Sequence, residues 1–169
     1  MRRTAIGSIA IVLLASLQCE PQETKEGPLT RLRQAVIVVE PLSPAARAAD
    51  LSIKSLKSQM LVGLRRDIPK LAVRESARPR LYLLVMVLRD RTVGGRELGF
   101  SVCVSLQMWR RVTILEDVGV GEVTSIITTV WSRDGIVTGP RSSIRQQVKD
   151  NIAEKLTEFA ADYYRQNPQ

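Results

Sequence analysis

The sequence predicts an α+β fold, a two-layer sandwich in which two helices cover one face of a sheet. Three strand-like segments follow one another from Leu81 to Trp131, and one segment with helical periodicity lies on each side of them. Each helical segment has a single apolar stripe, and the sheet has one strongly apolar face. Both helices are therefore expected on that face. The expected order is strand, helix, a three-stranded antiparallel meander, and helix.

The first strand is expected at Ala35–Val39, where a continuous apolar run predicts burial on both faces. Ser43 and Pro44 then predict a helix start, with serine as the N-cap and proline at the first helical position. Pro69 predicts the end of this helix. Its apolar face is predicted from residues spaced three or four positions apart, namely Ile53, Leu56, Met60, Leu64 and Ile68.

The central hairpin is predicted to turn at Gly94–Gly95, as a two-residue turn with positive φ. Directly opposed residues then have numbers that sum to 189. Four apolar pairs fall on one face of this hairpin, which fixes the register because a slip of one residue would disperse them. These pairs are Leu81 with Met108, Leu83 with Leu106, Val85 with Val104, and Val87 with Val102. The same alternation places Leu98 and Phe100 on this face, and the other face is mixed and small.

The third strand is expected at Val123–Trp131, a run rich in threonine, valine and isoleucine. Its facing stays open, because Val123, Ile127 and Trp131 form one apolar set while Ile126 and Val130 form another. Turns are predicted at Asp134–Gly135 and Gly139–Pro140. Ser143 with Gln146 predicts a capping box. The second helix is predicted to bury Ile144, Val148, Ile152, Leu156, Phe159 and Tyr163, and to expose its charged side.

The N-terminal segment is typical of an export signal. Arg2 and Arg3 precede an apolar run from Ala5 to Ala15, which is too short to span a bilayer and fits a signal-peptide core. We therefore expect residues 1–18 to be a signal peptide, 19–33 a polar tether and 34–169 a single domain. Cys19 directly follows the signal, so it is either a lipidated N-terminus or an incidental cysteine near an ordinary cleavage site. Export predicts a periplasmic or membrane-anchored protein.

Charge is concentrated in the middle of the chain. The net charge is +8, and Gly63–Arg111 holds eleven basic residues against four acidic ones. Such a region favours an anionic molecule or an acidic partner, or it is an ordinary solvated surface. The scarcity of aromatic residues and the export signal argue against nucleic acid. The candidate contacts are Arg89, Arg91, Trp109, Arg110 and Arg111, since tryptophan and arginine dominate binding surfaces.

The sequence contains no histidine, which removes the Ser-His-Asp and Cys-His nucleophile schemes and histidine-containing zinc sites. The one close acidic pair is Glu116–Asp117, in a glycine-containing segment where neighbouring side chains point apart. Cys103 is predicted to be a buried free thiol in mid-strand. Trp109 and Trp131 are expected near strand ends. No cofactor or metal is expected, and the chain is predicted not to be an enzyme.

A signal, a cysteine and the order strand–helix–three strands–helix within 169 residues resemble two groups of bacterial envelope proteins. One is the lipopolysaccharide-assembly lipoprotein that plugs the outer-membrane transport barrel. The other is the amino-terminal α/β domain of the TolB periplasmic protein and its relatives in flagellar and secretion lipoproteins. The resemblance concerns the order and length of elements, so no site residue is transferred from it.

Two functions are therefore expected. The first is a non-enzymatic, exported cell-envelope protein that acts as an assembly or interaction domain, with a possible lipid anchor at Cys19. The alternative is a periplasmic binding module for an anionic lipid, a polysaccharide or an acidic partner, which would use the basic middle region.

Overall fold

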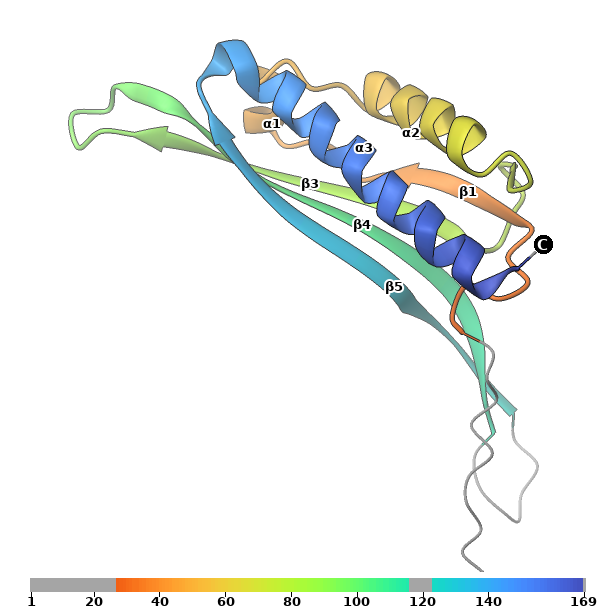
Figure 1. Cartoon of the computed structure of the whole chain (residues 1–169). Coiled ribbons are helices and arrows are strands. Elements are labelled where there is room, and N and C mark those ends of the chain that lie inside the picture. Colours follow the sequence, from red (N-terminus) through yellow and green to blue (C-terminus); the bar gives the residue numbers. More distant parts are fainter. Residues whose placement is uncertain (1–26, 116–122, 169) are drawn as a thin grey trace, which may run out of the picture.

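The structure is a computed structural model that describes residues 27–115 and 123–168 and has two layers (Figure 1). Along the chain the elements are β1 (Gln34–Val39), α1 (Pro44–Ala48), α2 (Ile53–Asp67), β2 (Ala72–Val73), β3 (Arg80–Arg91), β4 (Glu97–Leu115), β5 (Val123–Gly139) and α3 (Arg141–Gln166). The strands form one sheet in the order β2-β1-β3-β4-β5. The helices lie together on one face of it (Figure 1). The predicted two-layer α+β sandwich is confirmed, including the antiparallel meander of β3, β4 and β5.

The first strand is less buried than predicted. β1 pairs in parallel with both β2 and β3. Ala35 and Ile37 are buried, but Val36 and Val38 alternate with them and are only half-buried. The continuous apolar run therefore does not mean burial on two faces, because helices cover one face alone.

The first helical segment is divided into two helices. Ser43 caps α1 as predicted, since its Oγ accepts a hydrogen bond from the Ala46 N–H at 3.2 Å. The chain then breaks at Asp50, which has a φ of 57°, and α2 starts again with Ser52 as its N-cap. α2 ends at Asp67, before Pro69, as predicted. Its apolar stripe is buried except for Ile53, which lies in the exposed first turn.

The β3–β4 hairpin has the predicted register, and all four predicted apolar pairs are buried. The loop is different from the prediction. The Thr92 N–H donates to the Arg96 carbonyl at 2.9 Å, and only Gly95, with a φ of 82°, has the positive φ predicted for both glycines. The loop thus has three residues instead of two. A register shift beside it leaves Leu98 unpaired and exposed, not on the apolar face.

β5 continues well beyond the predicted end at Trp131. The predicted turn at Asp134–Gly135 is wrong, because both residues lie within the strand and Gly135 pairs with Val104. A Cβ on Gly135 would lie 2.5 Å from Asn151 Oδ1. The glycine therefore allows α3 to approach the sheet closely. The strand ends at Gly139, directly before α3, where the second turn was predicted.

A bulge in β5 decides which of its side chains point toward the helices. Met108 pairs with Trp131 and Trp109 pairs with Thr129, so Val130 has no partner. Trp131 is buried under α3, whereas Ile126 and Ile127 are both exposed. Neither predicted apolar set continues through the bulge, because the extra residue changes the alternation. The prediction that Trp109 and Trp131 lie near strand ends is wrong, because both lie within their strands, β4 and β5.

The last helix, α3, buries the predicted apolar stripe completely. It begins earlier than predicted, with Pro140 as a cap that makes no side-chain hydrogen bond. The predicted capping box is therefore wrong, and Ser143 lies in the first helical turn. The charged side is not uniformly solvated, since Lys155 and Asp162 are both buried.

The segment before β1 belongs to the packed domain. Leu29 and Leu32 lie in the hydrophobic core, although the sequence placed them in the predicted tether. The Leu29 N–H donates to Gln166 Oε1 at 2.7 Å, and Asn167 Nδ2 donates to the Leu29 carbonyl at 2.9 Å. The chain therefore joins the domain beside the C-terminal end of α3. None of the helices in the described residues is long and apolar enough to span a membrane.

Candidate functional site

The structure separates the predicted contact residues into two groups. Arg89 and Arg91 are exposed at the β3–β4 loop, at one end of the sheet. Trp109 pairs with Arg80 at the other end of β3, which places it about 30 Å away at the usual rise per strand residue. The predicted residues do not form one continuous surface.

Two residues of the second group, Trp109 and Arg110, already have interaction partners within the molecule. Trp109 stacks on Tyr82 with ring centroids 5.1 Å apart, and its Nε1 donates to Gln107 Oε1 at 2.8 Å. Arg110 Nη1 donates to the Pro28 carbonyl at 2.7 Å. Arg110 therefore ties β4 to the turn before β1. In this group Arg111 alone is classed as exposed.

Cys103 is a free cysteine, and it is only partly buried. It lies on the sheet face without helices, paired with Met86 on one side and Ile136 on the other. The prediction of a buried thiol is therefore wrong, because no layer covers this face in the described residues. Cys19 and the Glu116–Asp117 pair lie outside the described residues. In residues 27–115 and 123–168, no group of acidic or cysteine side chains could hold a metal ion.

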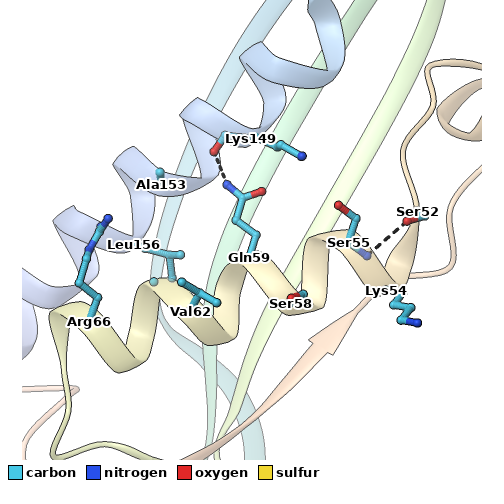
Figure 2. A pocket seen from close by; sticks show the side chains of 11 residues that line it. Ser52, Lys54, Ser55, Ser58, Gln59, Val62, Arg66, Lys149, Ala153 and Leu156 are labelled. Carbon is cyan, nitrogen blue, oxygen red and sulfur yellow. Dashed lines mark hydrogen bonds between the residues drawn. The ribbon is translucent and has the colours of Figure 1, made fainter.

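A groove of about 660 Å³ lies between α2 and α3 (Figure 2). Gly63 sits at its base, where an added Cβ would lie 2.7 Å from Leu156 Cδ1. The glycine therefore lets the two helices approach closely. The apolar residues Val62, Ala153 and Leu156 line part of the groove, and its polar lining residues are Ser52, Lys54, Ser55, Ser58, Gln59, Arg66 and Lys149.

The polar side chains of the groove are incompletely paired. Gln59 Nε2 donates to the Lys149 carbonyl, which joins the two helices (Figure 2). Gln59 Oε1 is buried and has no hydrogen-bond partner within the described residues. Arg66 forms an ion pair with Asp67, in which Arg66 Nε lies 2.6 Å from Asp67 Oδ1. Hydrogen bonding to that carboxylate raises the pKa of the Arg66 side chain. Lys54 and Lys149 form no ion pair in the described part of the chain.

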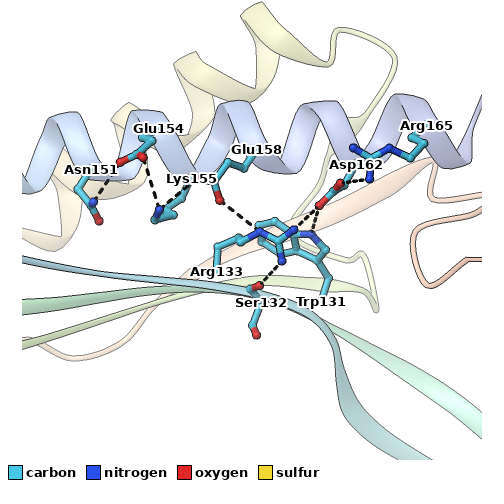
Figure 3. A network of polar contacts seen from close by, with 9 residues as sticks. All are labelled: Trp131, Ser132, Arg133, Asn151, Glu154, Lys155, Glu158, Asp162 and Arg165. Atoms are coloured by element: carbon cyan, nitrogen blue, oxygen red, sulfur yellow. Dashed lines mark hydrogen bonds and ion pairs between the residues drawn. The ribbon is translucent and has the colours of Figure 1, made fainter.

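A polar network joins β5 to α3 on the covered face (Figure 3). Asp162 accepts hydrogen bonds at its Oδ2 from Trp131 Nε1 and Arg133 Nη2, each at 2.9 Å. Its Oδ1 lies 2.9 Å from Arg165 Nη1. Arg133 also lies over the Trp131 ring, 5.3 Å from the centroid. This carboxylate is fully partnered, so the network fixes the helix on the sheet and offers no free group to a ligand.

The sequence did not predict the groove between α2 and α3 or the polar network between β5 and α3. Gly63 and Gly135 are the signals that could have located them, because each interrupts a regular element without a turn. A glycine inside a helix or strand marks a close approach of another element. The partners across each approach, Leu156 and Asn151, follow only from the tertiary structure.

No protein-family model matches the sequence, and no curated protein matches it. Solved structures with a similar fold include the following three. A variant of the PelC dodecamer from Paraburkholderia phytofirmans is 23% identical over 75% of this chain and 84% of that chain, with a TM-score of 0.41. Rare lipoprotein B from Shewanella oneidensis is 12% identical over 78% and 91%, with a TM-score of 0.28. A minor lipoprotein from Acinetobacter baumannii is 12% identical over 78% and 94%, with a TM-score of 0.34.

Two of these three structures are lipoproteins by name. The narrower resemblance to either envelope group stays a prediction. All three TM-scores are below 0.5, so no function is assigned to this chain from them.

Proposed function

We propose that this protein is an exported accessory domain of a bacterial cell envelope, which is held at a membrane through Cys19 and binds another envelope component. The observation that supports this is the spacing between the export-type segment and the packed domain. Cys19 directly follows the predicted signal, and Leu29 is already buried in the core. The intervening residues are few, so a lipid on Cys19 would keep the domain close to the bilayer.

The intact mass of the protein, purified from membranes of a bacterial host, tests this proposal. We expect a mature chain that begins at Cys19 and carries added acyl mass, because a cysteine after the signal is the acceptor in lipoprotein precursors. Cys19→Ser should remove the acyl mass and release the protein from the membrane fraction. A full-length chain with residues 1–18 intact in the soluble cytoplasmic fraction would overturn the proposal. Cleavage without acylation would retain export and remove the anchor.

A second candidate function is the binding of an anionic molecule, and the groove between α2 and α3 favours it. Lys54 and Lys149 lack ion pairs within the described residues, and Gln59 Oε1 lacks a hydrogen-bond partner there. Positive charge beside serine hydroxyls is suited to an anionic, hydroxyl-bearing ligand such as a charged polysaccharide. This ligand class is the alternative predicted from the sequence, but none of the predicted contact residues lines the groove.

Inorganic polyphosphate is a suitable first probe of the groove. Lys54→Gln with Lys149→Gln should weaken its binding by about tenfold, the loss of one to two charge-assisted contacts. Arg89→Gln with Arg91→Gln removes the same charge from the distant β3–β4 loop and is the matched control. Equal weakening by the two pairs would mean attraction to net charge alone and would exclude the groove as the binding site.

A further inference from the structure

A second cavity, of about 450 Å³, lies at the end of the domain where the chain joins it. Its basic side chains are Arg31 and Arg33, from the segment before β1, and Lys70, from the loop after α2. Tyr163 and Tyr164 line it from the last turns of α3. These three segments are far apart in sequence but converge at one end of the molecule (Figure 1). We call this site the tether-end cavity.

The tether-end cavity has a surplus of positive charge. Among the described residues, no acidic side chain lines it. Two described acids near it in sequence already have partners. Asp67, close to Lys70, pairs with Arg66, and Asp162, next to Tyr163, pairs with Arg133 and Arg165. Arg33 and Lys70 are exposed and form no ion pair within the described residues. Two cations are therefore free to contact an external anion.

Aromatic side chains accompany these cations. Tyr163 is buried, and its ring meets the half-buried ring of Tyr164 edge to face, with centroids 5.4 Å apart. Tyrosine has an apolar ring with a polar tip and is enriched where protein meets the boundary between lipid and water. Basic residues beside tyrosines are the composition expected of a surface that contacts phospholipid headgroups.

The position of the cavity points to the same ligand. The Arg31 backbone N–H donates to Asn167 Oδ1 at 2.8 Å, and both residues line the cavity, so the segment directly before β1 lies at the cavity. Eight residue steps from Cys19 to Gly27 extend at most about 28 Å. An anchor on Cys19 would therefore hold this end of the domain at the membrane surface.

The opposite end of the molecule has a different charge balance. The β3–β4 loop at the far end of the sheet carries Arg89, Arg91 and Arg96, but Asp90 and Glu97 alternate with them. Its cations are thus partly offset by neighbouring acids. The two ends of the molecule therefore differ in net charge.

We propose that the tether-end cavity binds the headgroups of anionic phospholipids in the membrane that holds the protein, so that the end of α3 rests on the bilayer. Arg33 and Lys70 contact the phosphate groups, and Tyr163 and Tyr164 lie at the level of the headgroups. This inference rests on the proposed function, since the anchor at Cys19 brings the cavity to the membrane.

The test uses the mature protein purified from a bacterial host. This protein is reconstituted into phosphatidylcholine vesicles that either contain or lack phosphatidylglycerol. Lysines are acetylated briefly, and the extent at each position is read by peptide mass spectrometry. We expect Lys70 to react about fivefold more slowly when phosphatidylglycerol is present, and to regain its reactivity in high salt, because the contact is electrostatic. Lys57, which is exposed on α2 and lines neither the groove nor the tether-end cavity, should react equally in both vesicles and is the internal control.

Matched variants give the second arm of the test. Arg33→Gln should abolish most of the protection of Lys70, because it removes half of the free charge in the cavity. Arg89→Gln removes one charge from the opposite end and should leave the protection unchanged. Equal reactivity of Lys70 in the two kinds of vesicle would overturn the proposal, as would equal effects of the two variants.

The intact mass of the same sample separates this proposal from the proposed function. An acylated chain whose Lys70 is unprotected would overturn headgroup binding and leave the anchor in place. A chain without acyl mass whose Lys70 is still protected by phosphatidylglycerol would overturn the anchor and support headgroup binding on its own.

Discussion

The two faces of the sheet are built from the same strands but differ in what covers them. On the helix side, Leu83 and Leu106 pair across β3 and β4 and are completely buried. On the other side, Met86 and Ile136 flank Cys103 in one row and are 52% and 75% exposed. Apolar side chains alone therefore do not define the core. The core is the face onto which the helices pack, and the other face contributes little burial to stability.

The largest expected effect lies on the covered face. Phe100→Ala should lower the free energy of unfolding by about 3 to 5 kcal/mol, because it removes a fully buried aromatic ring and leaves a cavity. Met86→Ala, on the open face of the same hairpin, should change it by less than about 0.5 kcal/mol. Urea denaturation of both variants measures the difference. Similar losses would mean that another layer covers the open face in solution.

The next effect concerns the polar network on the covered face. Asp162→Ala should lower the free energy of unfolding by about 2 to 3 kcal/mol, because the buried Trp131 Nε1 loses its acceptor and Arg133 loses a carboxylate. Asp134→Ala removes an exposed carboxylate from the open face and should have almost no effect. Thermal unfolding of the two variants makes the comparison. A small loss for Asp162→Ala would mean that water replaces the carboxylate.

Two neighbouring residues of β5 give the sharpest comparison of the faces. Gly135→Val places carbon atoms where Asn151 now lies, and the overpacking should cost about 1 to 2 kcal/mol. Ile136→Val, one position along and on the open face, should be nearly neutral. Chemical denaturation would show whether the contrast holds. Tolerance of valine at Gly135 would mean that α3 does not approach the strand this closely.

The sequence was sufficient for the fold because its strongest signals are local and periodic. The four apolar pairs of the hairpin determine their own register, and the stripe of α3 predicts the buried side of the helix. The sequence-based predictions were wrong where a tertiary contact outweighs the local sequence preference. Asp134–Gly135 has the composition of a turn, but β4 pairs with it and α3 packs over it, so it forms strand.

The candidate sites were less predictable than the fold. The basic middle region was recognised by composition, but β3 carries Arg89 and Arg80 to opposite ends of the sheet. The tether-end cavity combines residues 31–33, 70, 163, 164, 167 and 168, which no spacing rule connects. Their convergence follows from the buried Leu29 and Leu32, which fasten the segment before β1 to the end of α3.

The smallest expected effect is the pH dependence due to Tyr163, on the covered side at the tether end. Burial raises the pKa of the Tyr163 hydroxyl above its usual value of 10, the neighbouring Tyr164 raises it further, and Arg33 opposes them. Below pH 10 the hydroxyl is protonated in both states, so its contribution to stability is fully present. Above pH 10 the unfolded chain loses this proton first, and stability falls as the pH rises through the folded pKa.

Tyr163→Phe should therefore flatten the loss of stability above pH 10. One proton limits the slope to about 1.4 kcal/mol per pH unit, and only a fraction of that is expected for a single shifted group. Urea midpoints of both proteins between neutral pH and pH 11 measure the difference. Tyr82→Phe, on the open face, is the control for general alkaline effects. Parallel curves for wild type and Tyr163→Phe would mean that the hydroxyl is solvated, and that the cavity it lines is more open than the contact with Tyr164 indicates.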